Sequence, residues 1–183
     1  KELEGIHSRT DFDLSSHEKF SGKKLQYFDP EINERYVPYV VETSIGLDRM
    51  FLAVFSNALQ DEELENNTTR TVLKLPAVLA PTKAAILPLV KKDGLPEVAR
   101  KIVEDLKWDF NVDYDEKDAV GRRYRRQDAV GTPFCITVDH DTLNDNTVTI
   151  RHRDTMEQQR VKIQDLREII KKEVDVKTWL MKM

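Results

Sequence analysis

Residues 95–139 read LPEVARKIVEDLKWDFNVDYDEKDAVGRRYRRQDAVGTPFCITVD and decide the fold, because helical and strand patterns alternate along them. We predict helices at 95–106 and 119–130. Residues 109–114 and 134–139 are short runs that contain β-branched and aromatic residues, which are typical of strands. Strands that alternate with helices indicate a layered α/β domain.

Segments on both sides extend this pattern. We expect a buried strand at 72–80, a strand at 148–153 that forms a hairpin with 134–139, and a closing helix at 163–174. A hairpin added to alternating strands and helices gives a mixed sheet between helices. The sequence therefore predicts a three-layer α/β domain over residues 71–183.

The first 70 residues are organised differently. We expect loop and helix over 1–29, a strand at 36–42 in which Pro38 indicates an edge position or the strand's beginning, and an amphipathic helix at 47–59. Residues 60–70 read QDEELENNTTR and have no apolar period, so they predict a solvent-exposed connector. We place the domain boundary there.

Composition limits the class of protein. The chain has 183 residues, of which 39% are hydrophobic and 34% are charged, as is typical of a soluble globular protein. No apolar run approaches the ~20 residues that a membrane helix requires, so we do not expect a membrane protein. A formal net charge of −4 argues against indiscriminate coating of nucleic acid, because such binding depends on neutralising phosphates. Any RNA site must be local.

Cysteine and histidine usage predicts neither a disulfide nor a metal site. Cys135 is the single cysteine, and the apolar strand around it predicts a buried, unreactive thiol. The four histidines are widely separated: His7, His17, His140 and His152. Without a visible signal peptide, we expect a reducing, cytoplasmic compartment. Because the chain begins at Lys1, we also expect it to be a segment of a longer protein.

Residues 42–49, ETSIGLDR, lie where the predicted strand ends and the predicted helix begins. Gly46 lets the backbone approach a ligand closely, and Arg49 presents an always-charged guanidinium that suits a phosphate. Glu42 and Ser44 point to the same side of an extended segment and could bind an amino group. The alternative is that Glu42 and Arg49 form only a local ion pair at the start of the helix.

Residues 121–128, GRRYRRQD, form the densest basic cluster of the chain. Four arginines near one helix can neutralise phosphates, and Tyr124 and Gln127 suit stacking on unpaired bases and recognition of their edges. The alternative is a solvated helix face whose arginines pair with nearby acids: Glu116, Asp118 and Asp128.

Residues 42–53, ETSIGLDRMFLA, resemble the third signature motif of the glycine-type class II aminoacyl-tRNA synthetases, and residues 2–14 are similar to the family segment just upstream. Four further blocks resemble the anticodon-binding domain that this family shares with the histidine, threonine and proline synthetases: 79–85, 121–128, 131–134 and 149–155. The resemblance runs from Glu2 to about residue 172.

The resemblance implies a fold and an activity. Residues 1–70 would be the tail of a class II antiparallel-sheet catalytic core, and residues 71–183 an anticodon-binding α/β domain with a mixed five-stranded sheet. The longer protein that contains this segment would be a cytoplasmic homodimer that ligates glycine to its tRNA and uses ATP, with Mg²⁺, as a substrate. No bound cofactor is expected in this segment. Because the first and second signature motifs are absent, we expect this chain alone to be inactive and to carry mainly anticodon recognition.

The resemblance also implies site residues, with no catalytic residue and no metal ligand among them. Expected ATP contacts are Glu2, Leu3, Gly46, Leu47, Asp48 and Arg49. Expected glycine contacts are Glu42, Thr43, Ser44, Ile45 and Gly46. Expected tRNA contacts are Lys83, Arg123, Arg126, Arg151 and Arg153. Glycine anticodons end in two cytosines, whose amino groups suit carboxylate acceptors and whose ring acceptors suit arginine. The alternative function is a non-catalytic, synthetase-like module that binds RNA or protein.

Overall fold

The structure is a computed structural model that describes residues 2–64 and 68–181. The chain folds into two compact units, Lys1–Ala53 and Val54–Met183. Within the described ranges, no helix combines the length and the apolar character needed to cross a membrane.

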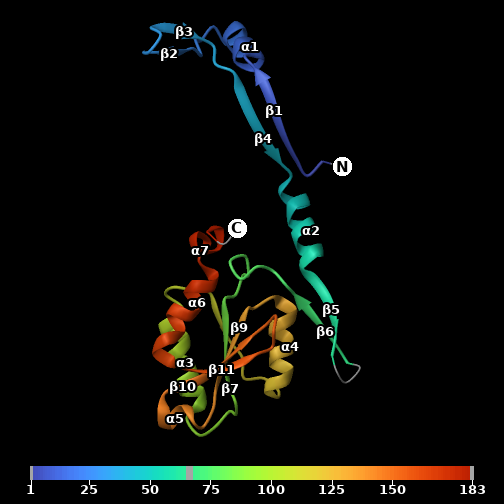
Figure 1. Cartoon of the computed structure of the whole chain (residues 1–183), viewed down its shortest axis with the longest axis vertical. Coiled ribbons are helices and arrows are strands. Elements are labelled where there is room, and N and C mark those ends of the chain that lie inside the picture. Colours follow the sequence, from blue (N-terminus) through green and yellow to red (C-terminus); the bar gives the residue numbers. More distant parts are fainter. Residues whose placement is uncertain (1, 65–67, 182–183) are drawn as a thin grey trace. The chain divides into compact units, whose positions relative to one another are not determined.

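The larger unit is built on a five-stranded mixed sheet with the strand order β11-β10-β9-β7-β8 (Figure 1). Strand β7 (Ala84–Pro88) runs parallel to β8 (Val112–Tyr114) and to β9 (Phe134–Val138). Strand β10 (Thr147–His152) pairs antiparallel with both β9 and β11 (Gln158–Lys162). The mixed five-stranded sheet confirms the predicted α/β architecture.

Helices cover both faces of this sheet (Figure 1). Helices α3 (Leu95–Leu106) and α6 (Leu166–Val174) pack with the strands in the main hydrophobic core. Helix α4 (Val120–Val130) lies on the other face, where Tyr124 packs against a smaller cluster of Ala85, Leu87 and Cys135. Strand residues alternate between these two cores, because successive side chains point to opposite faces of a sheet. The three predicted layers are confirmed.

Short helical elements complete the unit. Helix α5 (Thr142–Asp145) joins β9 to β10, where the sequence predicted one hairpin. A 3-10 turn at Ile163–Asp165 precedes α6, so the predicted closing helix begins a little later than expected. Helix α7 (Val176–Leu180) follows α6 and is capped by the Asp175 side chain, which accepts a hydrogen bond from the backbone amide of Thr178.

Two strands of the sheet were missed from the sequence, for opposite reasons. All five residues of β7 are buried, so the segment reads AAILP without the apolar and polar alternation of a half-exposed strand. The prediction placed a buried strand at 72–80 instead, and that placement is wrong beyond Leu73. Strand β11 lies at the sheet edge and buries only Val161, so QQRVK looks like a loop.

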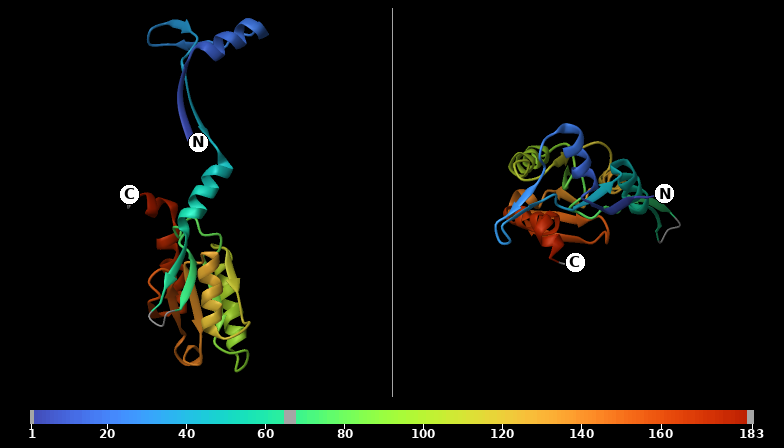
Figure 2. Two further views of the ribbon diagram at one scale, coloured as in Figure 1. Left: turned by 90° about the vertical axis from the view of Figure 1, so that its right-hand side faces the viewer. Right: turned by 90° about the horizontal axis from the view of Figure 1, so that it is seen from above.

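The segment predicted as an irregular connector forms part of a hairpin. Strand β5 (Leu59–Glu63) pairs antiparallel with β6 (Thr69–Leu73), as Figure 2 shows. Strand β6 contacts α4 and turns Arg70 and Val72 inward, so this hairpin belongs to the larger unit although its sequence is polar. Residues 65–67 of the predicted connector lie outside the described residues.

The smaller unit is a pair of antiparallel strands with local additions. Strand β1 (Glu4–Thr10), where loop was predicted, pairs with β4 (Val40–Ile45). Helix α1 (Phe12–Ser21) and a small hairpin lie between them in the sequence. The hairpin strands are β2 (Tyr27–Asp29) and β3 (Glu34–Tyr36). Helix α2 (Leu47–Ala58) follows β4 and confirms the predicted amphipathic helix.

The turn after α4 gives a test of how closely the hairpin packs. Gly131 has a φ of +83°, and a Cβ added there would lie 3.0 Å from the Leu73 carbonyl oxygen. We expect Gly131→Ala to lower the free energy of unfolding by about 1–3 kcal/mol, measured by urea denaturation followed by circular dichroism. Gly121→Ala, inside α4 with open space around it, is the control and should leave stability unchanged or slightly higher. Equal stability of the two variants would contradict the packing described.

Candidate functional site

The β1–β4 pair brings two segments of the smaller unit to one pocket of about 220 Å³. The Arg49 guanidinium donates to the Glu2 carbonyl at 2.8 Å, and the Gly46 amide donates to the Leu3 carbonyl at 3.2 Å. The pocket is lined by Glu2, Leu3, Glu4, Gly5, His7, Ser44, Ile45, Gly46 and Arg49. Most of the expected ATP and glycine contacts therefore meet in one place, although they come from two distant stretches of sequence.

Other expected contacts of this site lie outside the pocket lining: Glu42, Thr43, Leu47 and Asp48. Glu42 has its Oε1 3.9 Å from a guanidinium nitrogen of Arg9. Since Arg49 contacts the Glu2 carbonyl, the alternative of an ion pair between Glu42 and Arg49 does not hold among the described contacts.

Arg123, expected to contact tRNA, is instead buried beneath the ends of two parallel strands. Its guanidinium donates to the carbonyls of Pro88 at 2.7 Å, Asp115 at 3.1 Å and Leu89 at 3.2 Å. Its Nε is buried and has no hydrogen-bond partner among the residues that the structure describes, and burial lowers the pKa of Arg123. The residue joins the segment after β7 to the segment after β8, and at 2% exposure it does not reach a ligand.

Arg126 remains exposed but is paired with acids of the loop before α4. Its Nη2 lies 2.7 Å from Asp115 Oδ2 and its Nη1 lies 2.8 Å from Asp118 Oδ2. The hydrogen bond to Asp115 raises the pKa of Arg126. Burial opposes ionisation of Asp115, but hydrogen bonds from the Lys117 amide and from Arg126 outweigh it and lower the pKa of Asp115. For this arginine, the alternative of pairing with nearby acids is confirmed.

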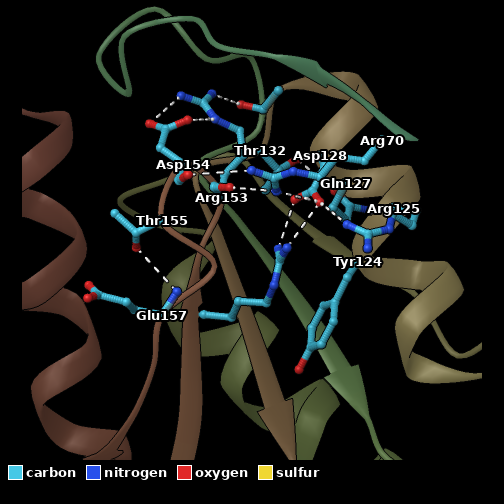
Figure 3. Close-up of polar contacts among 12 residues, drawn as sticks. Arg70, Tyr124, Arg125, Gln127, Asp128, Thr132, Arg153, Asp154, Thr155 and Glu157 are labelled. Atoms are coloured by element: carbon cyan, nitrogen blue, oxygen red, sulfur yellow. Dashed lines mark hydrogen bonds and ion pairs between the residues drawn. The ribbon is translucent and has the colours of Figure 1, made fainter. Parts of the chain in front are cut away.

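Arginines from three elements lie around the carboxylate of Asp128 (Figure 3). Its carboxylate is fully buried and accepts from Arg151 at 2.8 and 3.1 Å in a two-pronged contact. Arg70 of β6 donates to Asp128 Oδ2 at 3.1 Å, and Arg125 Nη1 lies 3.6 Å from the same oxygen. Arg151, an expected tRNA contact, is therefore an interior partner of Asp128.

The last two expected tRNA contacts are also held by protein acceptors. Arg153 is 3% exposed and donates to the carbonyls of Gly131 at 2.8 Å and Leu75 at 2.7 Å. Lys83 donates to the carbonyls of Ala77 at 3.1 Å and Val78 at 2.9 Å, and burial lowers its pKa. The expectation of direct RNA contact is thus corrected for three buried arginines: Arg123, Arg151 and Arg153. These residues hold loops and strands together.

The two residues expected to recognise bases face inward as well. The Tyr124 hydroxyl lies 2.6 Å from Thr137 Oγ1, and the Arg151 guanidinium stacks 4.8 Å from the Tyr124 ring centroid. Gln127 is buried, donates to Asp113 at 3.0 Å and accepts from the Thr132 hydroxyl at 2.6 Å. Both side chains therefore already have protein partners, Gln127 fully inside the domain and Tyr124 half-buried.

Two arginines of α4 that sequence reasoning did not select are exposed, as Arg126 is, but neither makes an ion pair shorter than 3.6 Å among the described residues. Arg122 is exposed and has no ion pair among the residues that the structure describes. The Arg125 side chain is 44% exposed, and its one ion pair within residues 2–64 and 68–181 is the 3.6 Å contact to Asp128. The helical period gives a signal that could have found them, since a helix that turns Tyr124 and Gln127 inward turns Arg122 and Arg125 outward.

The remaining candidates are the single cysteine and the possible metal ligands. Cys135 is buried, and burial raises the pKa of its thiol to about 12, so it is unreactive as predicted. Over residues 2–64 and 68–181, no group of three histidine, cysteine or carboxylate side chains could hold a metal ion.

Comparison with known proteins identifies the larger unit. Residues 83–173 match the model of the family described as "Anticodon binding domain". This range runs from just before β7 into α6 and includes the whole of α4. Residues 83–173 belong to the anticodon binding domain family. The mixed sheet and its two helical layers are consistent with that assignment.

Relatives extend the similarity beyond the anticodon binding domain. The chain is 54% identical over 93% of its length to the glycine--tRNA ligase of Chlorobaculum tepidum, and 56% identical over 95% to that of Clostridium perfringens. It is 51% identical over 95% of its length to the glycine--tRNA ligase of Borrelia hermsii. The chain spans 36%, 38% and 40% of the lengths of these three relatives.

The buried carboxylate gives a test of this arrangement. We expect Asp128→Asn to lower the free energy of unfolding by about 3–5 kcal/mol, because Arg151 would remain buried without its counter-charge and Arg70 would lose one of its two acidic partners. Urea denaturation followed by circular dichroism measures the effect. Asp118→Asn makes the same chemical change at an exposed pair and should cost no more than about 1 kcal/mol. Similar losses in the two variants would show that Asp128 is not the centre of a buried network.

Proposed function

We propose that the anticodon binding domain of this chain reads the anticodon of a glycine-accepting tRNA, within a longer protein that ligates glycine to tRNA. The family match and the printed names of the relatives support this proposal. The observation that carries it to particular residues is the pair of accessible guanidinium groups on α4, those of Arg122 and Arg125.

The charged side chains around Asp128 favour the binding of an anion near Arg125. The guanidinium groups of Arg70, Arg125 and Arg151 converge on the single carboxylate of Asp128. Arg70 also pairs with Glu62, but Glu62 is shared with Lys74, so positive charge is in excess around Asp128. A local excess of this kind can attract RNA phosphates although the whole chain has a net charge of −4.

The arginines proposed to contact RNA directly differ from those expected from the sequence. Arg122 and Arg125 replace Arg123, Arg151 and Arg153, whose buried guanidinium groups hold the surface in shape. The exposed Arg126 lies on the same helix and remains a candidate contact beside them. Lys83 is omitted, because two carbonyls already accept from its ammonium group. Arginine donors suit cytosine O2 and N3 as well as phosphates.

We propose a second role for the smaller unit, Lys1–Ala53, as the tail of a catalytic core. The sequence placed the end of this tail at residue 70, but the β5–β6 hairpin belongs to the larger unit that contains the anticodon binding domain. In this proposal the pocket at the β1–β4 pair contacts ATP, with Mg²⁺, through Glu2, Leu3, Gly46 and Arg49. Ser44 and Ile45 would face glycine. The grouping of these residues around one pocket supports an enzyme over a module that only binds RNA. A cytoplasmic homodimer that gains its activity from further segments belongs to the same proposal.

Substitution of the accessible arginines tests the RNA surface. We expect Arg122→Ala and Arg125→Ala each to weaken binding of a glycine tRNA anticodon stem–loop roughly tenfold. Each should also reduce the salt slope, which is the slope of the logarithm of the association constant against the logarithm of the salt concentration, by about one released ion. Fluorescence anisotropy at several salt concentrations measures both quantities.

The matched control removes two positive charges from the opposite face of the sheet. Lys101 lies on α3 and Lys172 on α6, and both are exposed. The double variant Lys101→Ala/Lys172→Ala should bind the stem–loop within about twofold of the unaltered chain. An equal loss in the control and the α4 variants would contradict a local site on α4.

A further inference from the structure

One carboxylate oxygen has more donors around it than it can bind equally well. Asp128 Oδ2 lies 3.1 Å from Arg70 Nη1, 3.1 Å from Arg151 Nη2 and 3.6 Å from Arg125 Nη1. Two of these contacts have hydrogen-bond lengths and the third is too long for one. The long contact belongs to Arg125, which Figure 3 draws together with Arg70 and Asp128. Arg125 is also the one exposed arginine of the three.

Arg70 is fixed from several directions at once. Besides Asp128, it donates to Glu62 at 2.6 Å and to the carbonyls of Arg153 at 2.9 Å and Asp154 at 3.4 Å. The hydrogen bond from Lys74 lowers the pKa of Glu62, so this partner stays ionised at neutral pH. Arg70 is 2% exposed and cannot itself contact RNA. It lies on the β5–β6 hairpin, outside the range 83–173 that matches the anticodon binding domain.

We infer that Arg70 is a positioning residue for RNA binding, because it occupies Asp128 Oδ2 and thereby leaves the Arg125 guanidinium available at the surface. This inference rests on the proposed function. Without Arg70, Asp128 would keep its two-pronged contact with Arg151 and regain acceptor capacity at Oδ2. Arg125, whose Nη1 already lies 3.6 Å from this oxygen, would turn inward to donate to it.

The arrangement links two parts of the chain that the sequence separates. Arg70 and Asp128 are 58 residues apart, and only the folded hairpin brings them together. The state of the hairpin therefore affects the RNA surface through one shared oxygen atom, without a direct contact between hairpin and RNA.

A double-mutant cycle on RNA binding tests the inference. Arg70→Met removes the donors while keeping a long side chain, and Arg70→Lys keeps the charge but not the planar fork. We expect each to weaken binding of the anticodon stem–loop about five- to tenfold, and Arg70→Met to reduce the salt slope by about one ion, as Arg125→Ala does. Arg70→Met combined with Arg125→Ala should bind no more weakly than Arg125→Ala alone.

A measurement without RNA separates this inference from the proposed function. Modification of Arg125 by phenylglyoxal, followed by peptide mass spectrometry, should slow at least threefold in Arg70→Met and Arg70→Lys. Modification of Arg122 should stay unchanged in the same samples and serves as the internal control. Circular dichroism confirms that each variant is folded before it is compared.

The outcomes are distinct. Unchanged Arg125 modification in folded Arg70 variants would overturn the inference while leaving the proposed function intact. A loss of RNA affinity in the double variant that equals the product of the losses in the two single variants would also overturn the inference. It would show that Arg70 and Arg125 act independently. Failure of the unaltered chain to bind the stem–loop would overturn both the proposed function and the inference built on it.

Discussion

The buried carboxylate of Asp128 is the constraint on which the larger unit depends. A charge removed from water is costly unless opposite charges and hydrogen bonds compensate it, and Asp128 is compensated by Arg151 and Arg70. Because Asp128 lies on α4, Arg151 on β10 and Arg70 on β6, one carboxylate connects a helix, a strand inside the sheet and the hairpin. The hairpin thus becomes part of the unit despite its polar sequence.

The arginines of α4 differ in their burial and in their partners. Arg123 stabilises the ends of the parallel strands from inside, and Arg126 fixes the loop before the helix. The side chains of Arg122 and Arg125 are exposed. The charged network around Asp128 contains more positive than negative groups. The basic cluster of α4 therefore contains one buried arginine, one exposed arginine that is closely paired with acids, and two exposed arginines that the proposed function assigns to RNA contact.

Local patterns were sufficient for part of the fold. The helical periods of α2 and α3 and the β-branched run of β9 could be recognised without knowledge of the rest of the chain. Strand β7 could not, since a strand covered on both faces has no alternation, and β11 could not, since it is an almost wholly exposed edge. The roles of Arg123 and Arg151 depend on acceptors brought in by folding, such as the Pro88 carbonyl, 35 residues away. The pocket residues Glu2 and Arg49 were identified by family resemblance, and the structure explains their grouping through the β1–β4 pairing.

The most direct measurement is the affinity of this chain for a glycine tRNA anticodon stem–loop, compared at one moderate salt concentration with the same stem–loop carrying changes at its two cytosines. Anticodon reading on the α4 surface predicts tighter binding of the unaltered RNA, by a factor of roughly 5 or more for each changed base that is contacted. Equal affinity for both RNAs, or no binding of either, would contradict it.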